Sequence, residues 1–273
     1  MKGMSNENVL ELYKKERLGE VFHNKHGTLM KIIKYNNAND IWVEFQDEYK
    51  IKIHTSYKNF KNGVVKNPYD KEVYDVGYIG KGKYDKKNYP KVYQQWIDML
   101  RRCYDPYYLN KKPTYIDCYV CNEWLCFQNF AKWCEENYYE VKNEIMHLDK
   151  DILIKGNKIY SPETCMFVPE RINILFVKNK SIRGKYPIGI SEYKEKKSNY
   201  KCLLVRCNFF DKEKNKNIVK NLKTFPINRP FQAFTCYKNF KENYIKQVAD
   251  EYKELIPIKL YEAMLKYEVE IND

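Results

Sequence analysis

The chain has 273 residues, enough for two or three compact units, and 49 lysines and arginines against 36 aspartates and glutamates. The net charge of +13 favours a polyanionic partner, nucleic acid first, or serves solubility alone. No stretch approaches the roughly 18 apolar residues that span a bilayer, and the start lacks the apolar run of a secretory signal. These features exclude a membrane-spanning class and predict a soluble, cytoplasmic protein with no membrane partner.

The N-terminal quarter of the chain has short apolar runs. Residues 6 to 17 are predicted to form a polar helix. Residues 18 to 69 alternate apolar and polar residues in runs such as TLMKIIKY and DIWVEF, with turns at NKHG, NNAND and KNG. This pattern predicts a small antiparallel barrel or curled sheet of four or five strands. His23 and His26 lie in a turn beside Gly27, where we expect solvent exposure and not a ligand role.

The middle of the chain combines a basic loop with two amphipathic helices. Residues 70 to 90, with GKGK and several tyrosines, fit a solvated linker or a loop that lies along phosphates. KVYQQWIDMLRRCYD and CNEWLCFQNFAKWCEENYYE place apolar side chains at helical spacing. The residues expected in the core of these helices are Val92, Trp96, Met99, Leu100, Cys103, Trp124, Phe127, Phe130 and Cys134.

Nine cysteines, an odd number scattered along the chain, favour reduced thiols over a disulfide framework. Cys118 and Cys121 form a CxxC pair that Cys103 and Cys165 could complete as a four-cysteine zinc site. A second close-spaced pair is missing, and single cysteines among apolar residues commonly pack as small hydrophobes. We therefore do not expect zinc.

The C-terminal third begins with a lysine-rich stretch, after which strand patterns return. ISEY, YKCLLVRC and NIVKNLKTF are predicted strands, and FQAFTCYKNFKENYIKQVADEYKE is a predicted helix. Pro257 interrupts the pattern, and IKLYEAMLKYE is expected to form a last short helix.

The stretch MHLDKDILIKGNKIYSPETCMFVPERIN carries the candidate chemistry. In a strand that begins at MHLDKD, His147, Asp149 and Asp151 project from one face. KGN and YSPE supply turns, CMFV is the returning strand, and Pro169 suits the first position of a helix. Asn173 then lies about one turn inside that helix. The predicted order is strand, loop, strand, helix.

These residue types suit metal-dependent phosphodiester chemistry. The Asp149 carboxylate and the Asn173 amide oxygen are hard ligands suited to Mg²⁺, which stabilises charge on a scissile phosphate and its leaving oxygen. His147 could take the proton from an attacking water, because histidine is the side chain that most often serves as a general base. On spacing alone, a charged hairpin capped by a satisfied asparagine is the alternative.

LDKD followed by GNKIYSPETCMFVPERIN resembles the HNH, or ββα-metal, endonucleases of bacteriophages. Upstream, Trp96, Met99, Arg102 and Cys103 resemble a WxxMxxRC element of these proteins, and VCNEWLCFQNF resembles their VCxEWxxFxxF element. The resemblance covers residues 91 to about 180. It implies a nuclease that hydrolyses DNA with Mg²⁺ or Mn²⁺.

By this resemblance Asp149 binds metal or activates water, and Asn173 corresponds to the helical asparagine. A histidine directly follows the metal-binding aspartate in the family pattern, but Lys150 stands there in this chain. A lysine neutralises phosphate charge but is a poor base unless burial lowers its pKa. The general base is thus open, with His147 nearest. A catalytically degenerate phage regulator that binds nucleic acid or protein, such as a counter-defence factor, is the alternative.

Residues 184 to 252 resemble the AP2-like DNA-binding domain often appended to these endonucleases, on GKYPIGISEYKEKKSNYKC, two further strands and the helix that follows. DKEKNKN replaces the family's glycine-containing turn, and PINRPFQAF departs from its common helix start. The resemblance implies a three-stranded sheet that reads the major groove of double-stranded DNA. The candidate contacts, each with a solvated basic face as its alternative, are Lys185, Tyr193, Lys194, Lys196, Lys197 and Arg206.

We therefore predict an α+β protein of three domains. Residues 1–75 form a small SH3-like β-barrel, on pattern only, residues 76–182 the HNH-like core, and residues 183–273 the AP2-like domain with C-terminal helices. The expected function is DNA cleavage, in the host cytoplasm if the protein is phage-encoded. Composition leaves RNA binding open, because basic and aromatic residues serve both nucleic acids.

Overall fold

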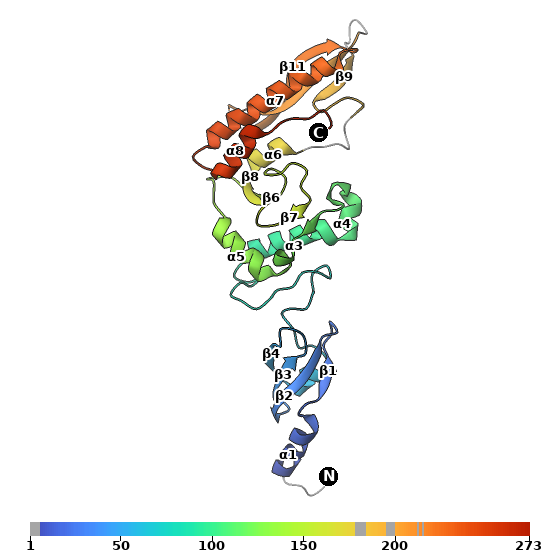
Figure 1. Cartoon of the computed structure of the whole chain (residues 1–273), viewed down its shortest axis with the longest axis vertical. Coiled ribbons are helices and arrows are strands. Elements are labelled where there is room, and N and C mark those ends of the chain that lie inside the picture. Colours follow the sequence, from blue (N-terminus) through green and yellow to red (C-terminus); the bar gives the residue numbers. More distant parts are fainter. Residues whose placement is uncertain (1–5, 178–183, 195–199, 212, 215) are drawn as a thin grey trace. The chain divides into compact units, whose positions relative to one another are not determined.

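In the computed structural model, the described residues are 6–177, 184–194, 200–211, 213–214 and 216–273. The fold is mixed α+β, as the sequence predicts (Figure 1). No helix of these described segments is long and apolar enough to cross a lipid bilayer.

Two compact units divide the chain. The first comprises residues 1–137 and 158–162, and the second comprises residues 138–157 and 163–273. The expected nuclease core, residues 76–182, therefore contributes to both units.

A four-stranded antiparallel sheet follows the N-terminal helix α1 (Asn6–Arg17). Its strands, in spatial as well as chain order, are β1 (Val21–His23), β2 (Leu29–Asn37), β3 (Asp40–Phe45) and β4 (Lys52–Thr55). Alternation along β2 and β3 buries Met30, Ile32, Ile41 and Val43 on one face.

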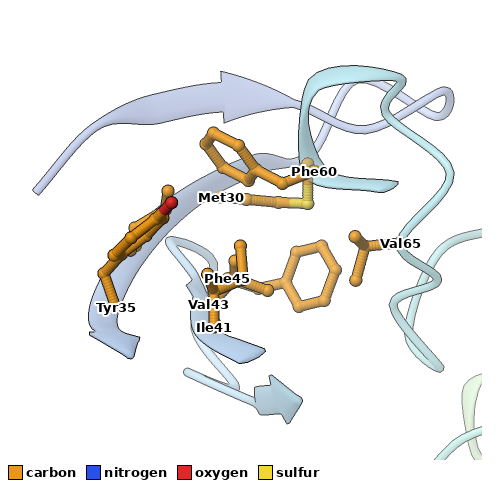
Figure 2. Close-up of a cluster of buried hydrophobic side chains, with 8 residues drawn as sticks. Met30, Tyr35, Ile41, Val43, Phe45, Phe60 and Val65 are labelled. Atoms are coloured by element: carbon orange, nitrogen blue, oxygen red, sulfur yellow. The ribbon is translucent and has the colours of Figure 1, made fainter. Parts of the chain in front are cut away.

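Of the two predicted forms, the barrel is wrong, because the sheet is open and β1 and β4 are its two edges. The alternative, a sheet of four or five strands, agrees with the four strands observed. Helix α2 (Tyr57–Lys61) contributes to the core of this sheet, since its Phe60 is fully buried there (Figure 2). Ser56 begins this helix, with its Oγ accepting from the Asn59 N–H at 3.2 Å. Val65 completes the cluster.

The rest of the first unit is mainly helical. Its elements are α3 (Pro90–Tyr104), α4 (Pro106–Lys111), the 3₁₀ turns Pro113–Tyr115 and Asn122–Leu125, α5 (Phe127–Asn137), and the parallel pair β5 (Tyr119–Val120) and β7 (Ile159–Tyr160). Both predicted amphipathic helices are present, although the second begins only at Phe127 and Trp124 lies in the 3₁₀ turn before it. Trp96, Met99, Trp124 and Phe130 are buried as expected, whereas Val92 is only half-buried. Close packing needs Gly77, where a Cβ atom would meet Leu100 Cδ1 at 2.5 Å.

The second unit joins a β-hairpin and helix to a three-stranded sheet. Its elements are β6 (Met146–Asp149), β8 (Met166–Pro169), α6 (Glu170–Phe176), β9 (Ile190–Lys194), β10 (Lys201–Asp211), β11 (Lys216–Pro226), α7 (Pro230–Tyr252) and α8 (Ile258–Lys266). The three predicted C-terminal strands and both helices are confirmed.

The three-stranded sheet is antiparallel in the order β11-β10-β9, and α7 packs on one face of it (Figure 1). Leu203, Val205 and Cys207 of β10 face the helix and bury their side chains against Tyr237 and its neighbours. Gly189 is required where the loop meets this helix, because its φ is +76° and a Cβ atom would lie 2.1 Å from the Tyr237 ring. The opposite face of the sheet is not covered by α7.

Candidate functional site

The strand, loop, strand, helix order predicted for the candidate stretch is confirmed in the second unit. β6 and β8 pair antiparallel along their full lengths. α6 follows β8 without a break, and Pro169 is the residue before the helix, one position earlier than predicted. The N–H of Glu170 donates to Ile145 O at 2.8 Å, which fixes the start of the helix beside β6.

Asp149 ends β6 and stabilises the turn that follows. Its Oδ1 accepts hydrogen bonds from the N–H groups of Asp151, at 2.8 Å, and Ile152, at 2.7 Å. Burial raises the pKa of this carboxyl, although the two N–H donors oppose the shift. Within the described chain, no hydrogen bond engages its second oxygen. Asp149 thus combines a turn-forming oxygen with one that remains available to a ligand.

Lys150 does not project into solvent as a free cation. It is 6% exposed, and its Nζ donates to Asp151 Oδ1 and to Asn157 O, both at 2.7 Å. Asn157 returns a bond from Nδ2 to Lys150 O at 2.8 Å. Lys150 therefore holds the loop between β6 and β7, and Asp151, expected on the strand face, lies beyond the end of β6 as its partner.

His147 and Asn173 are both half-buried in the second unit. His147 shares a face of β6 with Asp149 by strand alternation. Asn173 lies about one turn into α6. Its neighbours Ile172 and Leu175 are buried, and Ile174 is exposed. Neither side chain makes a hydrogen bond to another described residue.

Arg171 anchors α6 to the C-terminal elements. Its Nη2 donates to Glu251 Oε2 at 2.7 Å, and its guanidinium lies over the Phe210 ring, 4.8 Å from the centroid. Glu144 accepts both the Arg171 N–H, at 3.3 Å, and the Tyr252 hydroxyl. Burial and this carboxylate raise the pKa of Tyr252 to about 12. Arg171 therefore connects the ββα unit to α7 by a charge-assisted bond and to β10 by a cation–π contact.

The face of the three-stranded sheet opposite α7, here called the polar face, carries exposed polar side chains beside the apolar Val219. At its centre lies Arg206, an exposed residue of β10 whose Nη2 donates to Ser191 Oγ at 2.8 Å. Asn221 of β11 lies opposite Arg206 in the register, and Asn208 is the next outward residue of β10. Both asparagines are exposed. The sequence prediction missed both, although the period-two spacing of Asn208 with Arg206 along one strand was a usable signal.

The other candidate contacts occupy different places around this sheet. Tyr193 is 43% exposed on the polar face, and Lys194 is exposed at the end of β9. Lys185 is exposed and lies 3.6 Å from Glu192. The remaining two candidates, Lys196 and Lys197, lie outside the described residues.

A second group of metal-ligating side chains lies in the first unit. His26, Asp70 and Glu72 each offer one ligand atom, and these atoms lie within 4.8 Å of one another. Asp70 is buried and already accepts from Asn24 Nδ2, at 2.6 Å, and Thr28 Oγ1, at 2.5 Å. These bonds connect the β1–β2 turn to the segment after α2, which explains the position of Asp70 without a metal.

Comparison of the chain with protein-family models, with curated proteins and with solved structures gives no match. The functional argument therefore depends on the geometry above.

Proposed function

We propose that the chain is a DNA-binding endonuclease of the HNH-like, ββα-metal kind, in which a divalent ion is held by Asp149 and Asn173. The observation that carries the proposal is the continuous β6–β8–α6 unit, with a carboxylate at the end of its first strand and an amide in its helix. This order of elements is the one that the sequence resemblance implies.

The donor set fits Mg²⁺ or Mn²⁺. The donors are a carboxylate and an amide oxygen, which are hard ligands, and the carboxylate keeps one oxygen outside the turn that it forms. When bound, the ion would stabilise negative charge on the scissile phosphate and on the leaving oxygen.

The protein's own residues would carry the proton transfer. His147 is the candidate general base, because it shares a strand face with Asp149 and an imidazole nitrogen can accept a proton from water. Lys150 is a poor candidate, since its ammonium is already bonded to Asp151 and to a loop carbonyl. The proposal thus assigns Lys150 to positioning the loop.

DNA would bind across the polar face of the three-stranded sheet. Arginine and asparagine are the side chains that pair with guanine and adenine edges in the major groove, and Arg206, Asn208 and Asn221 lie together on this face. Lys185, Tyr193 and Lys194, all exposed, are the candidate phosphate or sugar contacts.

A second candidate function is DNA binding without cleavage. The position of Lys150 favours it, since the residue that stands where the family has a histidine is committed to a structural role. In that case the ββα unit serves as a scaffold for a regulator.

The two functions are separated by incubating the protein with supercoiled plasmid in Mg²⁺ or Mn²⁺, beside Asp149→Asn and Asn173→Ala. Asparagine at 149 keeps the oxygen that forms the turn, so the fold is retained while the charge is lost. Glu140→Gln, at an exposed acid of the same unit, is the matched control. Nicking by the wild type and the control alone supports the nuclease. Intact plasmid with a clear gel shift supports the binder.

A further inference from the structure

The second unit contains a cavity of about 590 Å³ at the edge of β10. β9 pairs with β10 only between Lys201 and Val205, so the strand continues beyond its partner. Four other parts of the unit line the cavity beside this part of β10. They are the end of α6, the residues that precede β9, helix α7 and the C-terminal segment. The apolar side chains of its wall include Ile174, Leu175, Ile188, Val219, Tyr237 and Val269. A cavity of this size lies within the usual range for small-molecule sites.

Lys241 of α7 lines this cavity and is only 8% exposed. It makes no hydrogen bond and no ion pair with any residue that the structure describes. Burial lowers its pKa, and the neighbouring Cys207 thiol opposes the shift only in part. A buried cation without a partner is costly, so its position calls for an explanation.

The carboxylates of the cavity wall do not compensate this charge. Glu192 pairs with Lys201 at 3.1 Å and lies 3.6 Å from Lys185. Asp273 pairs with Lys155 at 3.0 Å. Both acids of the wall are therefore paired with other lysines. An anion from outside the protein would supply the charge that Lys241 lacks.

We propose that this cavity binds a small organic anion, whose carboxylate or phosphate group pairs with Lys241 while its apolar body packs against the aliphatic and tyrosine side chains of the wall. Exposed Gly184 and Lys185 form part of the wall, which gives solvent a route to the site. Removing solvent from the pair makes the bond stronger than one on an open surface. The site is separate from the residues proposed for metal binding, and it does not depend on DNA cleavage. Its wall does include Lys185, Arg206 and Asn208, which are also proposed DNA contacts.

The test is a titration of the full chain with 8-anilinonaphthalene-1-sulfonate, a fluorescent organic anion. Lys241→Met removes the charge and keeps the length of the side chain, and Lys246→Met removes the same charge from an exposed position of α7. Loss of a charge-assisted bond is expected to weaken binding by about 10-fold or more in Lys241→Met. Lys246→Met should bind within about twofold of the wild type, because an exposed charge contributes little.

Equal affinities of the wild type and Lys241→Met would overturn the proposal. Inorganic phosphate should compete with the dye in the wild type and should do so poorly in Lys241→Met. A second measurement needs no variant: acetic anhydride labelling of the wild type, read by mass spectrometry, should find Lys241 protected by the dye and Lys246 unprotected. Labelling of Lys241 that the dye does not change contradicts the proposal.

A measurement of duplex binding distinguishes a small-molecule anion from the phosphates of DNA. A small-molecule site predicts that Lys241→Met binds a duplex as tightly as the wild type. A loss of duplex affinity in Lys241→Met would assign Lys241 to the DNA backbone instead and would overturn the small-ligand proposal.

Discussion

Arg206→Ala is the substitution that probes the proposed DNA face most directly. Arg206 is exposed at the centre of the sheet face that α7 leaves uncovered, opposite Asn221 and bonded to Ser191. Only this exposed bond is lost from the folded protein, so the stability of the variant should stay within about 0.5 kcal/mol of the wild type. A loss of affinity can therefore be attributed to the interface.

The size of the effect depends on what Arg206 contacts. An arginine that reads a base edge contributes about 1–3 kcal/mol of discrimination, which corresponds to roughly a 5- to 150-fold change in Kd. A phosphate contact instead lowers affinity for all sequences and reduces the slope of log K against log salt by about 1.

The assay is fluorescence anisotropy with a labelled duplex at several salt concentrations. Lys220→Ala is the matched control, because Lys220 lies on the α7 side of the same sheet, with its ammonium over the rings of Phe209 and Phe240. Arg206→Ala should weaken binding strongly, and Lys220→Ala only slightly. Equal losses in the two variants would refute the assignment of the polar face and leave only a diffuse basic surface.

Three further predictions concern stability. Phe60→Ala should lower the local stability of the N-terminal sheet by about 3–5 kcal/mol, seen as faster hydrogen exchange in β2 and β3, whereas exposed Lys58→Ala should not. Lys241→Met should raise the unfolding free energy by about 1–3 kcal/mol. This gain should shrink as pH rises from the lowered folded pKa of Lys241 towards about 10.4, since the unfolded state then loses its extra proton. Asp149→Asn should gain stability over the wild type as pH rises from about 3.9 through the raised pKa of Asp149, measured by paired thermal melts.

Each of these has a contrary outcome. Unchanged exchange in Phe60→Ala would mean that α2 does not hold the sheet. A Lys241→Met variant that is less stable than the wild type at neutral pH would imply a buried partner for the ammonium. A stability difference for Asp149→Asn that moves in the opposite direction with pH would mean that hydrogen bonds and not burial control the Asp149 carboxyl.

Periodic segments were predictable from the sequence. The apolar spacing of α3 and α5 and the alternation in β10 identify both the elements and the side chains that are buried, as with Trp96 and Leu203. The barrel was predicted incorrectly because alternation fixes strands but not closure. The sequence pattern also did not show that a single-turn helix, α2, would contribute its Phe60 to the core of the sheet.

The sequence predicted which residues and which order of elements make up the candidate site. It did not predict the hydrogen bonds that these residues form. Lys150 reads in the sequence as a charged residue between two aspartates, and its burial depends on Asn157, across a loop. Lys241 carried a readable signal that was missed, because it lies four residues after Tyr237 and four before Ile245, on the buried stripe of α7. The parallel pairing of β5 with β7 is a long-range contact that local pattern does not encode.

Asp149 and Asn173 sharing one divalent ion is the central claim, and paramagnetic broadening by Mn²⁺ tests it most directly. In ¹⁵N-labelled protein, the side-chain amide signal of Asn173 and the amides after Asp149 are predicted to broaden first, and this broadening should disappear in Asp149→Asn. If those signals stay sharp while His26 and its neighbours broaden, the metal belongs to the cluster in the first unit and the proposed nuclease site is contradicted.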